Sequence, residues 1–198
     1  MKLLKKIVVV VTLVLSVFMT RIASSADKYD IDPAHSTIGF AVKHLMVSVV
    51  RGGFNEFNGS IDFDSKDPSA FKADLTIQTQ SINTNVSKRD THLKSPDFFN
   101  ADKFPTITFA SKKLTPQSSG YAITGDLTMH GVTKEITIPV SISGPIKSPF
   151  GTQVIGLSGE ITINRQDYGV SWSKNLDSGG LVVDDNVKVI VEIEADKK

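Results

Sequence analysis

Apolar residues alternate with polar or small residues along most of the chain from Asp27 onward, and this two-residue period constrains the fold most strongly. Successive side chains of a β-strand point to opposite faces, so the period predicts half-buried strands rather than helices. The alternating segments are residues 38–42, 60–64, 71–78, 106–110, 121–129, 136–142, 155–163 and 187–193.

Eight short strands separated by Gly- and Pro-containing turns predict an all-β fold, a sandwich or barrel of mostly antiparallel strands. The one good helical window is residues 86–95, which ends before Pro96 because proline cannot continue a helix. No internal linker divides the chain, so residues 27–198 are expected to form one domain.

The first 26 residues have the plan of a secretory signal peptide. Three lysines within residues 2–6 precede an apolar run from Ile7 to Met19, and Ser24-Ser25-Ala26 offers small residues for cleavage. A retained membrane anchor is the rival interpretation, but the run is short for a bilayer span. We therefore expect cleavage after Ala26.

Composition excludes several classes of protein. The absence of cysteine removes disulfides, thiol catalysis, iron–sulfur clusters and Cys-type zinc sites. Loss of the four cations of the leader would change the formal net charge from +1 to −3. Nucleic acid is not an expected partner, because neither charge provides a basic surface.

The apolar face of the predicted strands must lie inside a soluble barrel. An eight-stranded barrel has an interior that side chains can just fill, or that holds one small ligand. Gly125 and Gly159 fall on the apolar parity, where glycine either relieves strand bending around a closed core or leaves room for a cavity. Both interpretations stay open at this point.

A series of motifs in residues 27–198 also resembles a known family. The main ones are Asp32-Pro33-Ala34-His35-Ser36, Phe40-x-Val42-x-His44, Gly59-x-Ile61-x-Phe63-Asp64, Arg89-Asp90-x-His92-Leu93, Phe104-Pro105-x-Ile107-x-Phe109, Gly125-x-Leu127-Thr128 and Asn164-Arg165-x-Asp167-Tyr168-Gly169. In this order they are similar to the YceI family of secreted bacterial proteins, which have lipocalin-like barrels and bind polyisoprenoids.

This resemblance implies an eight-stranded antiparallel lipocalin-like barrel with a small helical insertion near one end. It implies an apolar channel for a polyisoprenoid or similar amphiphile, no catalysis, no cofactor other than such a lipid, and a periplasmic location. Some relatives are fused or genetically paired with b-type membrane cytochromes. The alternative function is therefore an interaction module serving a membrane cytochrome b and quinone system, and a homodimer is a further expectation.

The apolar residues at the inward-facing positions of the predicted strands would line such a channel. They are Phe40, Phe63, Leu75, Ile77, Ile107, Phe109, Leu127, Ile161, Ile163 and Val191. The competing interpretation is that the same side chains simply fill the barrel.

Polar residues near the strand ends are candidates for a head group or the channel mouth. Arg165 and Asp167 continue the parity of Ile161 and Ile163, and arginine suits a phosphate or carbonyl group. Arg89, Asp90 and His92 lie on the helical insertion and could cap the mouth. An Arg89–Asp90 ion pair that pins this insertion is the alternative role. Trp172, the only tryptophan, is expected to plug one barrel end.

Catalytic and metal-binding patterns are weak in this chain. Ser158 lies on a predicted strand, and its surroundings lack the final glycine of a nucleophile elbow. The four histidines show neither a helical pair nor a ligand cluster, so no metal site is predicted.

Overall fold

The computed structural model describes residues 26–177 and 179–198. Apart from Ala26, the predicted leader lies outside the described residues. The strands are β1 (Asp27–Ile31), β2 (Thr37–His44), β3 (Ser48–Phe54), β4 (Phe57–Phe63), β5 (Lys72–Gln78), β6 (Ile82–Asn83), β7 (Thr106–Pro116), β8 (Tyr121–Met129), β9 (Val132–Lys147), β10 (Gln153–Asn164) and β11 (Val183–Lys197).

Eight of these strands form a closed antiparallel barrel. Their order is β1-β4-β5-β7-β8-β9-β10-β11, and β1 pairs with β11 to close the ring. The all-β prediction and the eight-stranded barrel are therefore confirmed. Every predicted alternating segment falls on one of the strands, with Asp64 and Phe71 lying one residue outside β4 and β5.

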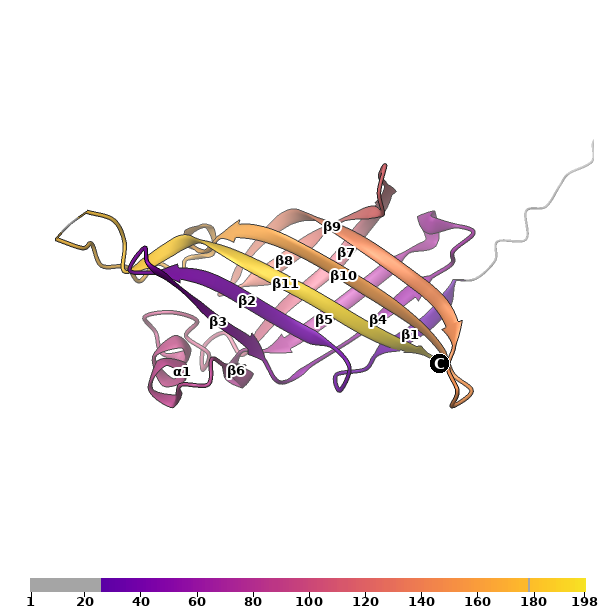
Figure 1. The fold of residues 1–198 in the computed structure, drawn as a ribbon, viewed down its shortest axis with the longest axis horizontal. Helices are drawn as coiled ribbons and strands as arrows, with labels where there is room; N and C mark the ends of the chain where they lie inside the picture. Colours follow the sequence, from indigo (N-terminus) through magenta and orange to yellow (C-terminus); the bar gives the residue numbers. More distant parts are fainter. Residues whose placement is uncertain (1–25, 178) are drawn as a thin grey trace, which may run out of the picture.

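The remaining strands extend the sheet at one end of the barrel only. β11 pairs with β1 through Ala195–Lys197, but through Val183–Glu192 it pairs with β2 instead. β3 and the short β6 follow β2, so the β2–β3 hairpin projects beyond the ring at the end where α1 lies (Figure 1). We call this end the mouth and the opposite end the closed end.

Helices are few and short within residues 26–177 and 179–198. Helix α1 (Ser87–Lys94) matches the predicted window, and single 3-10 turns occupy η1 (Pro68–Ala70), η2 (Thr79–Ser81) and η3 (Arg165–Tyr168). In the part of the chain that the structure describes, no helix has the length and apolar character needed to cross a bilayer.

The closed end is packed solidly. Tyr29, Ile155 and Ala195 have at most 1% of their surface exposed, and Phe63 meets Phe71 edge to face. These residues lie where β1 completes the ring, so access from this end is blocked by a packed core.

Gly125 serves close packing rather than a cavity. A Cβ atom there would lie 2.5 Å from the Phe109 ring and 2.5 Å from the carbonyl oxygen of Ala110. At Gly159 a Cβ atom would lie 2.8 Å from the carbonyl oxygen of Pro139. Glycine is needed at both positions because a neighbour occupies the space that a side chain would take.

Candidate functional site

The apolar interior of the barrel is incompletely filled. Several side chains that face the barrel interior are only half-buried. They are Phe40, Leu75, Phe109, Leu127, Ile161, Ile163 and Val191. Close-packed interiors leave few voids larger than a water molecule, so this exposure marks internal space.

Two inner cavities account for that space. One has a volume of about 100 Å³ and lies among strands of the closed ring. The other, of about 140 Å³, lies toward the mouth. They share walls made by Ile38, Ile77, Leu127, Ile163 and Val189, so they follow each other along the barrel axis.

A third cavity of about 420 Å³ lies at the mouth. Phe40, Val42, Leu93, Phe98 and Val183 line both this cavity and the neighbouring inner one. The three cavities therefore form a row from the mouth into the barrel, with almost entirely apolar walls.

Most of the residues selected from parity line this row. Phe40, Leu75, Ile77, Ile107, Phe109, Leu127, Ile161, Ile163 and Val191 each contribute to at least one inner cavity. Phe63 lines none of the three, because it lies at the end of β4 and packs in the closed end. Parity identified the inward face but could not tell which part of it is hollow.

Helix α1 is fastened to the barrel through Thr84, which is 4% exposed. The Thr84 backbone N–H donates to Asp90 Oδ1 at 2.9 Å, and its hydroxyl donates to the same oxygen. Arg89 donates from Nε to the Thr84 hydroxyl at 2.7 Å and from Nη2 to its carbonyl at 2.9 Å. Arg89 and Asp90 thus pin the insertion as the alternative role requires, but through Thr84 rather than a direct ion pair.

Aromatic side chains join α1 to the segment after η3. His92 lies edge-on to Phe98 and Trp172, with ring centroids 5.0 and 5.3 Å away. His92 Nε2 is also 2.7 Å from Asp97 Oδ2, which orients the ring. Trp172 is half-buried in the wall of the mouth cavity, so it lies at one barrel end but leaves a cavity beside it.

The charged and titratable side chains that line the mouth cavity are all basic. They are His44, Lys88, Arg89 and His92. Such a rim favours an anionic or strongly hydrogen-bonding head group over a cationic one. Sequence reasoning selected Arg89 and His92 but missed Lys88 and His44, although His44 ends one of the quoted motifs.

Arg165 faces the interior and lines the inner cavity nearer the mouth, as predicted, but its donors are not available for a head group. It is buried, and its five N–H groups all bond to the protein: to the carbonyls of Asp184, Val170, Trp172 and Val183, and to Asp185 Oδ1 at 2.9 Å. Burial lowers the pKa of its guanidinium, and the Asp185 carboxylate opposes that shift. Arg165 therefore clamps the start of β11 and has no donor left for a ligand.

Asp167 does not point inward as predicted. The strand ends at Asn164, whose side chain caps η3 by accepting the Gln166 N–H at 2.9 Å. The helical turn breaks the strand parity, so Asp167 is exposed and lies 3.4 Å from Lys134 Nζ.

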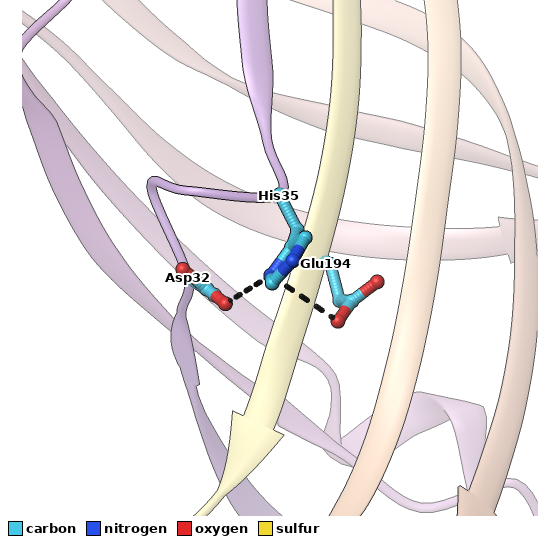
Figure 2. Close-up of side chains that lie close together, drawn as sticks. All are labelled: Asp32, His35 and Glu194. Atoms are coloured by element: carbon cyan, nitrogen blue, oxygen red, sulfur yellow. Dashed lines mark hydrogen bonds and ion pairs between the residues drawn. The ribbon is translucent and has the colours of Figure 1, made fainter. Parts of the chain in front are cut away.

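A cluster of Asp32, His35 and Glu194 lies on the outside of the barrel, where the chain steps from β1 to β2 (Figure 2). His35 Nδ1 lies 2.6 Å from Asp32 Oδ2 and 3.8 Å from Glu194 Oε1. Hydrogen bonding and charge attraction from Asp32 raise the pKa of His35, and the bond from His35 lowers the pKa of Asp32.

One atom from each member of this cluster lies within 4.8 Å of the others, a ligand set that divalent cations take. Both Asp32 oxygens are already hydrogen-bonded, to His35 and to the Ala34 N–H. Ser36 Oγ also donates a hydrogen bond to the Glu194 carbonyl and accepts one from the Glu194 backbone N–H. The cluster therefore fixes the step between the strands to β11.

Ser158 lies in the middle of β10, and its hydroxyl is 2.8 Å from Ser141 Oγ on the neighbouring strand. A nucleophile elbow requires a sharp turn from strand to helix, which this position does not have.

The comparisons with known proteins agree with this architecture. The sequence matches the YceI-like domain over residues 29–195. A UPF0312 protein of Staphylococcus aureus (strain N315) is 43% identical over 161 residues, which cover 81% of this chain and 92% of the relative. The crystallised YCEI protein of Campylobacter jejuni is 36% identical with a TM-score of 0.68, covering 79% of this chain and 90% of that one.

More distant structures share the fold alone. BcnA of Burkholderia cenocepacia has a TM-score of 0.73 at 23% identity, covering 83% of this chain and 98% of its own. A polyisoprenoid binding domain from Saccharophagus degradans has a TM-score of 0.64 at 18% identity, covering 88% and 100% respectively. With a family match across nearly all of the barrel and a relative at 43% identity, the chain belongs to the YceI-like family.

Proposed function

We propose that this protein binds a polyisoprenoid or similar long-chain amphiphile without catalysis, as a carrier or store in the periplasm. The row of apolar cavities that begins at the mouth is the observation that carries the proposal. The same-fold domain from Saccharophagus degradans is named for polyisoprenoid binding, which supports this choice of ligand by analogy of fold.

The energetics favour a tail that is held by burial alone. Moving ~400 Å² of apolar surface out of water contributes about 10 kcal/mol at roughly 25 cal/mol per Å². Ordering the tail and losing its free tumbling oppose this by several kcal/mol or more. Micromolar binding or better is thus within reach without a strong polar contact.

Cavity volume indicates how the tail would fit. A dry apolar cavity of about 150 Å³ accepts a benzene-sized molecule, and the inner cavities measure about 100 and 140 Å³. Each has room for a fragment near the size of one isoprene unit. A longer tail requires rotamer changes in the side chains between the cavities, above all Leu127 and Ile163, which line both.

The head group is placed at the mouth in this proposal. Arg89 gives two of its five N–H groups to Thr84, and no other acceptor takes the rest among the described residues. Those donors and the Lys88 ammonium supply positive charge on the wall of the mouth cavity, and the His44 ring adds a hydrogen-bonding group. A phosphate, carboxylate or carbonyl head would meet them while the tail lies inside.

The test is organic extraction of the purified protein followed by mass spectrometry. We expect the wild type to release a long-chain amphiphile and Ile161→Trp, which fills the inner cavity, to release little. Thr162→Trp is the matched control, because Thr162 is the exposed neighbour on the same strand. Leu127→Phe is a milder cavity-filling variant if the tryptophan disturbs folding. A wild type that yields no amphiphile and takes up no added polyprenol would overturn the proposal.

The same variants separate the alternative, a module serving a membrane cytochrome b. In that function the lipid is incidental, so Ile161→Trp would lose lipid yet retain a cytochrome in pull-down from solubilised membranes. Loss of both together, or absence of any cytochrome with the wild type, favours the carrier.

A further inference from the structure

Exposed large apolar side chains gather at the mouth. Leu45, Met46, Val47, Val49 and Val86 are 39%, 53%, 84%, 45% and 46% exposed. The first four lie on the β2–β3 hairpin and its turn, and the fifth lies at the start of α1. We call these five residues the tip patch. In the described ranges the other two such residues, Ile146 and Phe150, lie on the β9–β10 hairpin at the closed end (Figure 1).

The hairpin turn presents its apolar residues at some conformational cost. Leu45 and Met46 both have positive φ, 52° and 61°, in the three-residue turn between β2 and β3, a conformation that favours Asn and Gly. Bulky residues rarely adopt this conformation, and strain of this kind concentrates at functional sites. The Leu45 N–H donates to the Val182 carbonyl at 2.9 Å, which ties the turn to the segment before β11.

Basic side chains flank the tip patch. Lys43 and Arg51 are exposed on the same hairpin, and Lys88 is exposed on the first turn of α1. The nearby carboxylates of Asp90 and Asp97 are bonded to Thr84 and His92. Asp177 is exposed in the adjoining segment, as is Lys174, so neither sign dominates there. The half-buried Asp184 and Asp185 at the start of β11 bond to the Asn186 N–H and to Arg165. Apolar side chains flanked by lysine and arginine are the pattern of a surface that binds anionic lipid.

The tip patch is also continuous with the cavity row. Val86 belongs to the patch and lines the mouth cavity, and Val50 lines that cavity from the strand that carries Val49. A lipid that passes from a bilayer into this cavity would not have to cross water. This continuity favours a membrane surface over a protein partner as the occupant.

We propose that the mouth docks on an anionic membrane surface, with the tip patch inserted among the lipid head groups. Docking of this kind goes beyond ligand binding and requires no cargo in the barrel. Flotation with phosphatidylcholine vesicles, with and without phosphatidylglycerol, tests it on the protein purified from its own host. We expect flotation with the phosphatidylglycerol vesicles, weaker flotation without that lipid, and loss of binding as salt is added.

The decisive comparison is between two double variants. Met46→Ser/Val47→Ser removes apolar surface from the tip patch, and we expect it to lower vesicle partitioning about tenfold or more. Ile146→Ser/Phe150→Ser removes comparable surface from the closed end and leaves partitioning unchanged. Both variants keep the same amino-terminus, so any contribution from residues 1–26 cancels in the comparison.

Equal partitioning of the two double variants, or no flotation of the wild type, overturns the proposal. So does a wild-type dimer that the tip variant converts to a monomer without any change in vesicle binding, since the patch would then be a contact between copies. The Ile161→Trp variant separates membrane docking from ligand binding. If docking is correct, this variant still floats with the vesicles although it carries no amphiphile. If the wild type yields no amphiphile but floats through its tip patch, ligand binding fails and docking stands.

Discussion

At the scale of single residues, Arg165 illustrates how a ligand-like arginine becomes part of the framework. Its planar guanidinium offers five donors in fixed directions, and four backbone carbonyls and one carboxylate accept them. Lysine could not reproduce this arrangement, because it presents three donors from a single point.

We therefore expect Arg165→Met to lower the free energy of unfolding by about 3–5 kcal/mol, since it leaves several carbonyls without a partner and leaves the Asp185 carboxylate with only the neutral Gln166 amide as a donor. Arg165→Lys should recover only a small part of this loss. Lys134→Met breaks the exposed pair with Asp167 and should cost at most about 1 kcal/mol. Urea unfolding of the three variants measures these values. An Arg165→Met midpoint equal to that of Lys134→Met would contradict the clamp.

His35 gives a second prediction at this scale, through its raised pKa. A group with a raised folded-state pKa stabilises fully below its ordinary value, 6.5, and this effect is lost as pH rises through the folded value. Asp32 has a lowered pKa, so its effect is present above pH 3.8 and is lost as pH falls. Together they fix the β1–β2 step most firmly between these values.

NMR titration of the His35 ring should give a pKa above 6.5, and Asp32→Asn should lower it. Asp97→Asn is the control, because it removes the partner of His92 and leaves His35 untouched. The melting temperature lost in His35→Gln should be larger between pH 3.8 and 6.5 than above that range. A His35 pKa that Asp32→Asn leaves unchanged would show that the cluster does not couple.

At the scale of secondary structure elements, α1 depends on Thr84 more than on its own sequence. No α1 residue is buried, and its basic residues in the last turn are ordinary helix-end features. The hydroxyl of Thr84 links Arg89 to Asp90, so a single buried side chain holds the helix over the mouth.

Thr84→Val should therefore weaken the attachment of α1 by about 1–3 kcal/mol, because the Arg89 Nε–H and the Asp90 carboxylate each lose a partner. Hydrogen exchange of the α1 amides, followed by mass spectrometry, should become faster in this variant while β10 and β11 remain protected. Thr91→Val changes an exposed threonine on the same helix, whose hydroxyl bonds to the Ser87 carbonyl, and should have little effect. Equal exchange in both variants would disprove the role of Thr84.

The elements also show what alternation can and cannot predict. Every strand with a clear two-residue period was found, but β1, β3 and β6 were not. In β3, Val49 and Val50 are neighbours, and Gly52 and Gly53 then remove the pattern. Gly52 is required there because a Cβ atom would lie 2.6 Å from both Phe40 and Thr84. Tertiary contacts of this kind leave no periodic signal in the sequence.

For the candidate site, too, the sequence pattern predicts orientation but not tertiary packing. Parity predicts which side chains face inward, and nine of the ten chosen ones line the inner cavities. Whether inward side chains fill the interior depends on their summed volume against that of the barrel, which parity does not contain. Arg165 reaches the interior as its parity predicts, but the backbone carbonyls and Asp185 that take its donors could not be foreseen from the sequence. Asp167 points outward because the strand ends at Asn164 and the η3 turn breaks the parity.

At the scale of the whole molecule, bound amphiphile and stability should be linked. A ligand that binds only the folded state adds about 2.7 kcal/mol at a hundredfold excess over its dissociation constant. Removing it should therefore lower the melting temperature by roughly 5–10 °C for a chain of this size. Protein unfolded in guanidinium, stripped on a hydrophobic resin and refolded should show this loss, and added polyprenol should reverse it.

Protein taken through the same unfolding and refolding without the resin is the control. If mass spectrometry shows complete stripping and the melting temperature stays the same, the amphiphile makes no difference to the folded state.

The division of β11 between two partners makes the two ends of the barrel unequal. Where β1 completes the ring, any widening would break main-chain hydrogen bonds. At the other end α1 and its turn stand beside β6, whose one described partner strand is β3, so that end can widen by moving side chains and a short helix. Ligand entry and ligand exit should then both occur through this one opening. An amphiphile that enters with its tail first must leave with its head group first.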